Sequence, residues 1–200
     1  MIAICMATLA LVAAEASVMP ITVAVVPSPD VTDSLVKRIS AEAEAIWAPA
    51  GIALEWNRDA SKDDARRVVI EVTIDDRPAP VGRDGALGWL TFTRDRPDRC
   101  IHLSRASAED LLRRKPSPND ATITSHEAAI GRALGRALAH ELGHYALRSK
   151  VHTRRGLMRA LWPSEQTFAP FRDGFELTSQ ERLTAAGNLQ MELALSSSAP

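Results

Sequence analysis

The sequence predicts a single α+β domain that combines a mixed five-stranded sheet with an N-terminal helix, a long central helix and a C-terminal helix. Short runs of β-branched residues dominate the first half of the chain, a proline-free stretch rich in Ala and Leu follows, and a capping pattern begins the last helix. The chain has 200 residues, of which 46% are hydrophobic and 24% charged. This composition suits one packed core and excludes both a disordered chain and a membrane bundle.

The first half of the chain predicts a strand, a helix and then four further strands. Ile21–Val26 is rich in β-branched residues and stops at a proline. Apolar residues then recur at three- and four-residue steps as far as Trp47, which predicts a helix capped by Asp30 or Thr32. Alternation of apolar and polar residues predicts the remaining strands at 52–56, 67–74, 86–93 and 99–104.

The second half of the chain has the pattern of helices. Ser107 is expected to cap a short helix over 108–115, and a linker that contains two prolines follows it. Thr178 and Glu181 have the spacing of a capping box. They predict a last helix that runs to about Leu195.

A long helix is predicted from Ile123 to about Arg148. Small residues recur at every fourth position of this helix, forming a small-residue stripe of Gly131, Gly135, Ala139 and Gly143. A Gly in a helix interior costs about 1 kcal/mol of helix stability relative to Ala, so such a stripe indicates that another element packs closely against this face. The helix is therefore predicted to be buried.

The first 16 residues are predicted to be a signal peptide. An apolar run precedes Ala14-Glu15-Ala16, the small-x-small pattern of a cleavage site, and the run is too short to span a membrane. The run lacks an early Lys or Arg, so a buried N-terminal helix is the alternative. We expect a single exported domain over 17–200, secreted or periplasmic and without stable membrane insertion. It comprises an upper sheet part (17–119) and a lower part that begins with the long helix (120–200).

The charges of the chain nearly cancel. There are 24 Lys and Arg against 25 Asp and Glu, which gives a formal net charge of -1. Because no global field attracts phosphate backbones or anionic lipids, nucleic acid is not an expected partner. Only Cys100 remains after signal cleavage, so we expect no disulfide within the mature chain.

An H-E-x-x-H pattern, His140-Glu141-Leu142-Gly143-His144, lies within the long helix. Histidines four residues apart lie on one helical face, so both imidazoles can bind one metal ion. Zn²⁺ lowers the pKa of a water molecule on the metal towards about 7. Glu141 is placed to accept the proton of that water and to pass it to the leaving amine. The pattern therefore predicts a catalytic zinc site with Glu141 as general base.

Two features beyond the motif extend this prediction. A zinc site that keeps one position open needs a third protein ligand, and His152 follows His144 by eight residues, with Gly156-Leu157-Met158 behind it. In these residues the sequence resembles the metzincin clan of zinc proteases, in which a turn places a methionine beneath the metal. The resemblance implies that His152 completes the ligand set of the two motif histidines. It also implies that Met158 is the methionine of that turn.

The order of the predicted elements also looks like the upper part of a metzincin-like domain, which has a zincin fold. The resemblance implies that one strand lies at the edge of the sheet and pairs with an extended peptide substrate, a common mode of peptide recognition. The residues expected in this edge strand are Leu87, Gly88, Trp89 and Leu90.

The loop before the third histidine departs from the clan's pattern. The clan carries a Gly three residues after the second histidine and its third histidine six residues after it, whereas Leu147 and Lys150 stand at these positions. The helix is therefore expected to run about half a turn further, and His152 to arrive from a wider loop. Glu165, 21 residues past His144, is the alternative third ligand.

The other polar residues are expected to have structural roles. His126 lies 14 residues before the first motif histidine, about 21 Å along the helix at 1.5 Å per residue, which is too far to share its ion. His102 is expected to pack within its strand, and Cys100 to be a small buried residue. The side chains of Arg132 and Arg136 are expected to face solvent.

The sequence thus predicts a small exported zinc-dependent endopeptidase, a monomer that holds an extended peptide or protein substrate across a cleft. Glu141 is expected to act as general base and then as general acid. The alternative is a non-catalytic peptide-binding module of the same fold with a structural zinc. The intact Glu141 argues against it, because a structural site has no use for a carboxylate at the open position.

Overall fold

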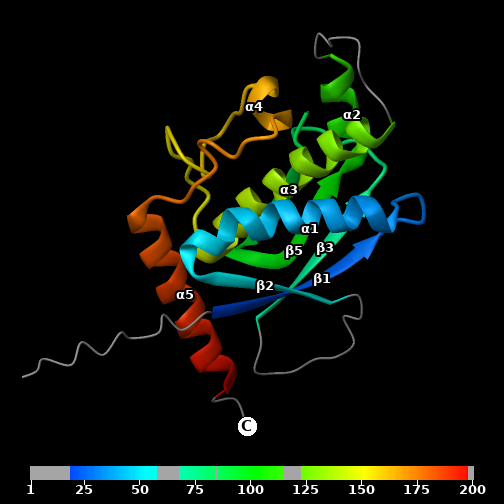
Figure 1. The fold of residues 1–200 in the computed structure, drawn as a ribbon. Coiled ribbons are helices and arrows are strands. Elements are labelled where there is room, and N and C mark those ends of the chain that lie inside the picture. Colours follow the sequence, from blue (N-terminus) through cyan, green and yellow to red (C-terminus); the bar gives the residue numbers. More distant parts are fainter. Residues whose placement is uncertain (1–18, 58–67, 84, 115–122, 198–200) are drawn as a thin grey trace, which may run out of the picture.

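A mixed five-stranded sheet forms one layer of the molecule, and α1 and α3 lie across one of its faces (Figure 1). The computed structural model describes residues 19–57, 68–83, 85–114 and 123–197. The strands are β1 (Met19–Pro27), β2 (Ile52–Asn57), β3 (Val69–Asp75), β4 (Gly88–Thr93) and β5 (Arg96–Ser104). The helices are α1 (Asp33–Trp47), the short 3₁₀ helix η1 (Ala48–Ala50), α2 (Arg105–Arg113), α3 (Ile123–Leu147), α4 (Ser164–Phe168) and α5 (Ser179–Ser197).

The predicted α+β class is confirmed, with its mixed five-stranded sheet and its N-terminal, long central and C-terminal helices. Among the described residues, none of the helices combines the length and the apolar character that spanning a membrane requires. The predicted signal peptide and the proline-containing linker before α3 lie outside the described residues.

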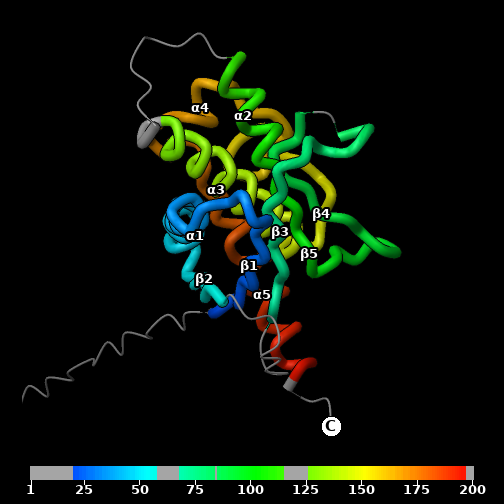
Figure 2. Tube along the Cα trace, turned by 90° about the vertical axis from the view of Figure 1, so that its right-hand side faces the viewer, coloured from blue at the N-terminus to red at the C-terminus, as the bar shows by residue number. Residues whose placement is uncertain are grey.

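The strand order in the sheet is β2-β1-β3-β5-β4, which Figure 2 shows from the side. β1 pairs in parallel with β2 and β3, and β3 pairs in parallel with β5. β4 is antiparallel to β5 and forms one edge of the sheet. The hairpin between them turns at Arg94 and Asp95, whose φ angles of 49° and 63° suit a two-residue turn between antiparallel strands. Because β4 is the last strand in this order, its other side is unpaired within the sheet.

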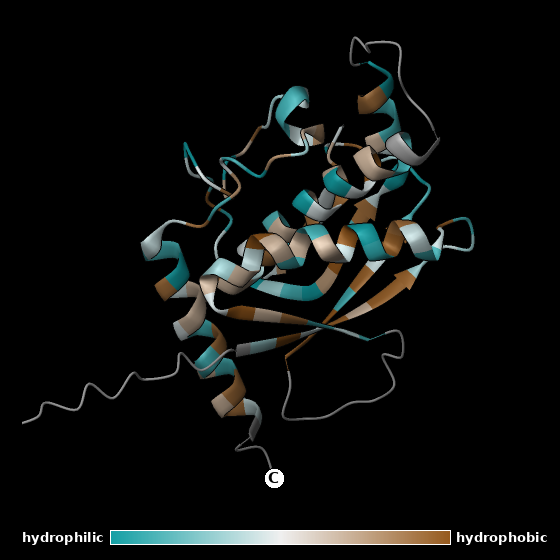
Figure 3. Ribbon diagram, viewed as in Figure 1, coloured by the Kyte–Doolittle hydropathy of each residue, from teal (hydrophilic) through white to brown (hydrophobic). Residues whose placement is uncertain are grey.

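Alternation along the strands divides the sheet into an apolar and a polar face. On β3, Ile70, Val72 and Ile74 are at most 1% exposed and face the helices. On β5, Ile101 and Leu103 are fully buried while His102 faces the other way, as predicted. Figure 3 shows the apolar colours of the strands gathered beneath α1 and α3. The core therefore lies between the sheet and these two helices.

The small-residue stripe of α3 allows close contact with α1. A Cβ added at Gly131 would lie 2.6 Å from the Cβ of Arg38, and one added at Gly135 would lie 2.5 Å from the Cβ of Glu42. One turn further on, the indole Nε1 of Trp47 donates to the carbonyl oxygen of Ala139 at 3.2 Å. The predicted close packing against this face is confirmed, because no side chain larger than hydrogen fits between the helices at the two glycines.

A buried guanidinium joins α3 to α1, to α4 and to the residues that follow α4. Arg136 is 3% exposed, and its Nε donates to the carboxylate of Glu42 at 2.8 Å, while Arg172 donates to the other oxygen of that carboxylate. The remaining donors of Arg136 bind the carbonyl oxygens of Gln166, Thr167, Ala169 and Phe171. The prediction that Arg136 faces solvent is wrong. Its guanidinium is stable inside the protein because the Glu42 carboxylate balances its charge and backbone carbonyl groups accept its remaining hydrogen bonds.

Arg132 is also half-buried, and its Nε donates to the carbonyl oxygen of Phe168 at 3.0 Å. The expectation that it faces solvent is therefore wrong for the same reason as for Arg136. Both arginines lie on the side of α3 that meets α4 and the residues after it, and carbonyl groups of that part of the chain accept their hydrogen bonds. A helix pattern alone does not reveal such a partner.

The helix caps partly follow the predictions. Thr32 caps α1, since its Oγ1 accepts the N–H of Leu35 at 3.1 Å. The capping box before α5 is reciprocal, with the Thr178 N–H bound to the Glu181 carboxylate and the Glu181 N–H bound to Thr178 Oγ1. These two predictions are confirmed.

The predicted cap of α2 is wrong. Ser104, the last residue of β5, caps this helix through a hydrogen bond from the Ser107 N–H to its Oγ at 3.0 Å. Ser104 keeps an extended backbone, with φ -104° and ψ 105°, which is the conformation that a capping residue needs. Helix α2 therefore begins directly where the strand ends.

The helix contact predicts opposite effects for two glycine-to-alanine substitutions. Gly135→Ala should lower the free energy of unfolding by about 1–3 kcal/mol, because the new methyl group pushes α1 away from α3. Gly187→Ala in α5, where a Cβ would meet nothing within 4 Å, should raise it by about 0.5–1 kcal/mol. Urea unfolding of the two variants and the wild type measures both. Equal stability of the two variants would contradict the proposed contact.

Candidate metal centre

Three histidines converge on one point beside the C-terminal half of α3. The Nε2 atom of His144 lies 3.0 Å from that of His140 and 3.2 Å from that of His152. One ligand nitrogen from each ring lies within 4.8 Å of the other two. His144 is buried, His140 is half-buried and His152 is exposed. The three predicted ligands therefore lie close enough to bind one metal ion.

Backbone carbonyl groups orient two of these rings. The Nδ1 of His140 donates to the carbonyl oxygen of Leu157 at 2.8 Å, and the Nδ1 of His144 donates to that of Ser149 at 2.7 Å. A carbonyl oxygen only accepts, so each Nδ1 carries the proton and each Nε2 of a neutral ring presents a lone pair. Two lone pairs at 3.0 Å repel each other, and a cation between them converts that repulsion into attraction. The donor set therefore fits a metal ion.

Burial keeps both motif histidines neutral. The pKa of His140 falls to about 4, mainly because the ring is removed from water, while the hydrogen bond to Leu157 opposes this change and the neighbouring His144 and His152 contribute to it. Burial also lowers the pKa of His144, although the carbonyl of Ser149 favours its charged form. Neutral imidazole is the form that binds metal, so the fold itself supplies the required protonation state.

The loop to His152 begins with a left-handed residue. Helix α3 ends at Leu147, and Arg148 follows with a φ of 50°. The Arg148 N–H donates to the Tyr145 carbonyl and the Ser149 N–H donates to the His144 carbonyl, which is the Schellman pattern of a helix end. The helix thus ends at Leu147, the clan's glycine position, and the chain reverses one residue later at Arg148, so the expected extension by half a turn is wrong. The reversal also brings the Ser149 carbonyl to the ring of His144.

Met158 packs against α3 between the two motif histidines. A Cβ added at Gly143 would overlap the Sδ of Met158, and Met158 is 1% exposed. The turn that carries it is held by two hydrogen bonds, from Thr153 N–H to the Met158 carbonyl and from Leu157 N–H to the Glu176 carbonyl, both at 2.8 Å. Gly143 of the small-residue stripe therefore makes room for this methionine, while the preceding carbonyl orients His140.

Glu141 points to the edge strand from the same turn of α3. Its side chain is almost buried, and burial raises its pKa to about 7. The positive charge of Arg83 and a hydrogen bond from the backbone N–H of Leu90 act in the opposite direction and favour the carboxylate. A carboxyl group with a pKa near neutrality can both accept and release a proton in that range.

Arg83 is a residue of this site that the sequence reasoning missed. Its Nη1 donates to the carbonyl oxygen of Leu90 at 3.3 Å, so Arg83 and Glu141 occupy the two backbone groups of the same residue. The only local signal was the presence of two glycines, Gly82 and Gly85, around a charged residue. A turn pattern does not tell where the side chain of the residue between the glycines will lie.

The predicted edge-strand residues divide into two sets. Leu87 precedes β4, and its carbonyl accepts the N–H of Ser104 at 2.9 Å. In an antiparallel pair the backbone groups alternate, so Gly88 and Leu90 direct theirs to the free edge of β4. The Trp89 side chain lies on the far face of the sheet, where its ring stacks on His102 at 5.4 Å.

Three other candidate residues lie apart from the three converging histidines. Glu165 is exposed in α4 and is not among the described residues that group as metal ligands. His126 pairs with Glu109 of α2 at 2.7 Å, which agrees with a structural role. Cys100 is half-exposed, 3.6 Å from the Nε2 of His102 on the far face of the sheet, so the prediction that it is buried is wrong.

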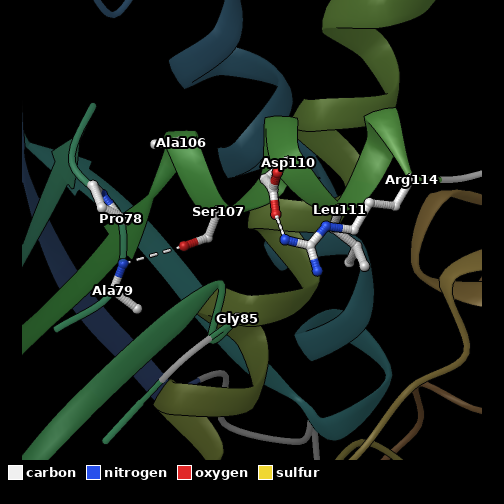
Figure 4. Close-up of a pocket in the computed structure, with 8 residues that line it drawn as sticks. All are labelled: Pro78, Ala79, Gly85, Ala106, Ser107, Asp110, Leu111 and Arg114. Atoms are coloured by element: carbon white, nitrogen blue, oxygen red, sulfur yellow. Dashed lines mark hydrogen bonds and ion pairs between the residues drawn. The ribbon is translucent and has the colours of Figure 1, made fainter. Parts of the chain in front are cut away.

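A hollow of about 330 Å³ lies between α2 and the chain segment before β4, and Figure 4 shows the residues around it. None of the three histidines lines it. A hydrogen bond from the Ala79 N–H to Ser107 Oγ ties the segment to α2 at this point. The hollow is therefore separate from the candidate metal centre, but its walls fix the segment that carries Arg83.

Comparison of the chain with models of known protein families and with curated proteins finds no match to either. The class of site consequently follows from geometry alone. It is a three-histidine group on an α+β scaffold, able to bind one metal ion, with a buried carboxyl group on the same helix.

The ligand set predicts the metal affinity of three variants. Wild-type protein should bind one Zn²⁺ or Co²⁺ per chain, and His152→Ala should weaken binding by at least about 100-fold, because a direct ligand is lost. Glu165→Ala and His126→Ala should bind as wild type does. Competition with a chromophoric chelator measures all four proteins. Weak binding by Glu165→Ala together with tight binding by His152→Ala would overturn the assignment of the third ligand.

Proposed function

We propose that the protein is a zinc-dependent endopeptidase of a metzincin-like, zincin type. His140, His144 and His152 would hold the zinc, and Glu141 would act as general base. The observation that carries the proposal is the combination of three converging imidazole nitrogens with a buried carboxyl group at the adjacent position of α3. The packing of the antiparallel edge strand β4 against this helix supports the same fold type.

Zinc suits the donor set better than hard cations do. Zn²⁺ binds neutral imidazole at 2.0–2.1 Å, so two nitrogens at tetrahedral angles stand roughly 3.3–3.4 Å apart. The two Nε2 separations of 3.0 and 3.2 Å are close to this spacing. Hard cations such as Mg²⁺ and Ca²⁺ prefer oxygen ligands instead. Three protein ligands leave one position open, which is the arrangement of catalytic zinc sites.

The chain's own residues supply the proton transfers. A bound zinc ion would polarise the peptide carbonyl group and make water more acidic. Glu141 accepts one proton from the attacking water, whose oxygen forms a bond to the carbonyl carbon. Glu141 then delivers that proton to the amide nitrogen as the C–N bond breaks. The second proton of the water also passes to the leaving nitrogen, so the products are a carboxylate and an ammonium group, and no further reactant is needed.

Substrate would bind as an extended strand along the free edge of β4. Gly88 directs its backbone groups to this edge, and its lack of a side chain lets β4 approach Ala137 of α3, whose Cβ would lie 3.4 Å from an added methyl group. A strand on this edge would therefore run close to the helix that carries Glu141. Recognition through the backbone agrees with a chain that has almost no net charge.

One observation favours a second function. The hydrogen bond between Glu141 and the Leu90 N–H gives the carboxylate a structural partner, as expected of a metal-stabilised binding module without activity. In that case the zinc would only hold the fold together, and peptides would bind along β4 without being cleaved. The first 16 residues of the chain predict export. Export and a monomeric state are compatible with either function.

Replacement of Glu141 separates the two functions. Glu141→Gln should keep one zinc per chain and lose cleavage by about 10²–10⁴-fold, the usual contribution of a general base. Glu165→Gln, an exposed glutamate in α4, is the matched control and should retain full activity. A library of internally quenched peptides measures cleavage, and metal analysis measures zinc. If zinc-loaded wild type cleaves no member of the library, the endopeptidase proposal is wrong and the binding module replaces it.

A further inference from the structure

Arg83 is held at the junction of two consecutive turns. The Arg83 N–H donates to the Pro80 carbonyl at 2.9 Å, and the Ala86 N–H donates to the Arg83 carbonyl at 2.9 Å. Gly82 and Gly85 have φ angles of 86° and 76°, the left-handed values that type II turns require at their third residue. The backbone of Arg83 is thus fixed by local geometry.

The same segment is anchored to α2 at its start. Ser104 Oγ donates to the carbonyl oxygen of Arg77 at 2.6 Å. The Ala79 N–H donates to Ser107 Oγ at 3.2 Å (Figure 4). Ser104 and Ser107 are both almost fully buried. The segment therefore has a defined place beside β4, and the exposed side chain of Arg83 extends from it to the strand edge.

The contacts of Leu90 interrupt the free edge of β4 at the site. A peptide that pairs with an edge strand needs both an N–H donor and a C=O acceptor from each outward-facing residue. At Leu90 the N–H is bound to Glu141 and the C=O is bound to Arg83. A substrate carbonyl opposite this residue must therefore find its donor elsewhere.

Arg83 has the donors that this carbonyl lacks. A guanidinium carries five N–H groups, and the bond to Leu90 uses one of them. Arg83 and Glu141 bind the two backbone groups of the same residue, Leu90, so the guanidinium lies in the immediate surroundings of the proposed general base. The water that Glu141 deprotonates must in turn lie next to the carbonyl carbon that it attacks.

We propose that Arg83 binds the carbonyl oxygen of the peptide bond that is cleaved. This inference rests on the proposed endopeptidase function and assigns to that site a second positive group, besides the metal. Negative charge develops on this oxygen as water adds to the carbonyl carbon. Arg83 therefore binds the transition state more strongly than the substrate, and its loss reduces kcat more than it raises KM.

Three variants of the full-length, zinc-loaded protein test the proposal. Arg83→Met should lower kcat by about 10²–10³-fold, the usual effect of losing one such donor. Arg83→Lys, which keeps the charge but not the fork of donors, should lose less. Arg77→Met is the matched control, because Arg77 belongs to the same segment but pairs with Asp75 at the surface, and it should keep wild-type kcat. All variants should keep one zinc per chain and the wild-type Tm.

Chemical rescue distinguishes direct contact from a structural role. Free guanidinium ion at low millimolar concentration should restore part of the kcat of Arg83→Ala and should leave the wild type unaffected. An unchanged kcat in Arg83→Met, a rise in KM alone, or an equal loss in Arg77→Met would each overturn the role of Arg83 while the endopeptidase function stands. A wild type that cleaves no peptide would instead overturn the endopeptidase function, and this inference with it.

Discussion

The close packing of α3 is the constraint on which the rest of the structure depends. Gly131 and Gly135 admit α1 on one part of the helix, and Gly143 admits Met158 on another. α3 carries both motif histidines and Glu141, so any change in these contacts moves the candidate site as well. Each glycine lowers the stability of the helix by about 1 kcal/mol relative to Ala, and the burial of apolar surface that the glycines permit offsets this cost.

The same packing couples the histidines to distant parts of the chain. His140 is oriented by the carbonyl of Leu157 and His144 by that of Ser149, so both chain reversals after α3 must form before the Nε2 atoms converge. The converging lone pairs are unfavourable without a cation, since a buried acceptor without a donor costs free energy. Metal binding is thereby linked to folding: a cation that binds only the assembled site stabilises the folded chain.

Residues of β4 contact the candidate site on one face of the sheet and pack against His102 on the opposite face. Leu90 faces α3 and bonds through its backbone to Glu141 and Arg83, whereas Trp89 stacks on His102 on the opposite face. The alternation of a strand produces this division. Because β4 is the edge strand, the backbone N–H and C=O of Leu90 have no partner strand and bind the side chains of Glu141 and Arg83 instead. The proposed role of Arg83 rests on this contact.

Features that depend on near neighbours in the chain could be predicted from the amino-acid sequence. Helical spacing places His140 and His144 on one face, alternation separates the two faces of β3, and Thr178 with Glu181 caps α5. The long-range partner of each polar group, in contrast, follows from the three-dimensional packing of the chain. It brought His152 rather than Glu165 to the motif and buried Arg136. Periodicity and capping are set by local backbone sterics, whereas burial and hydrogen bonding of a long side chain depend on segments far away in sequence.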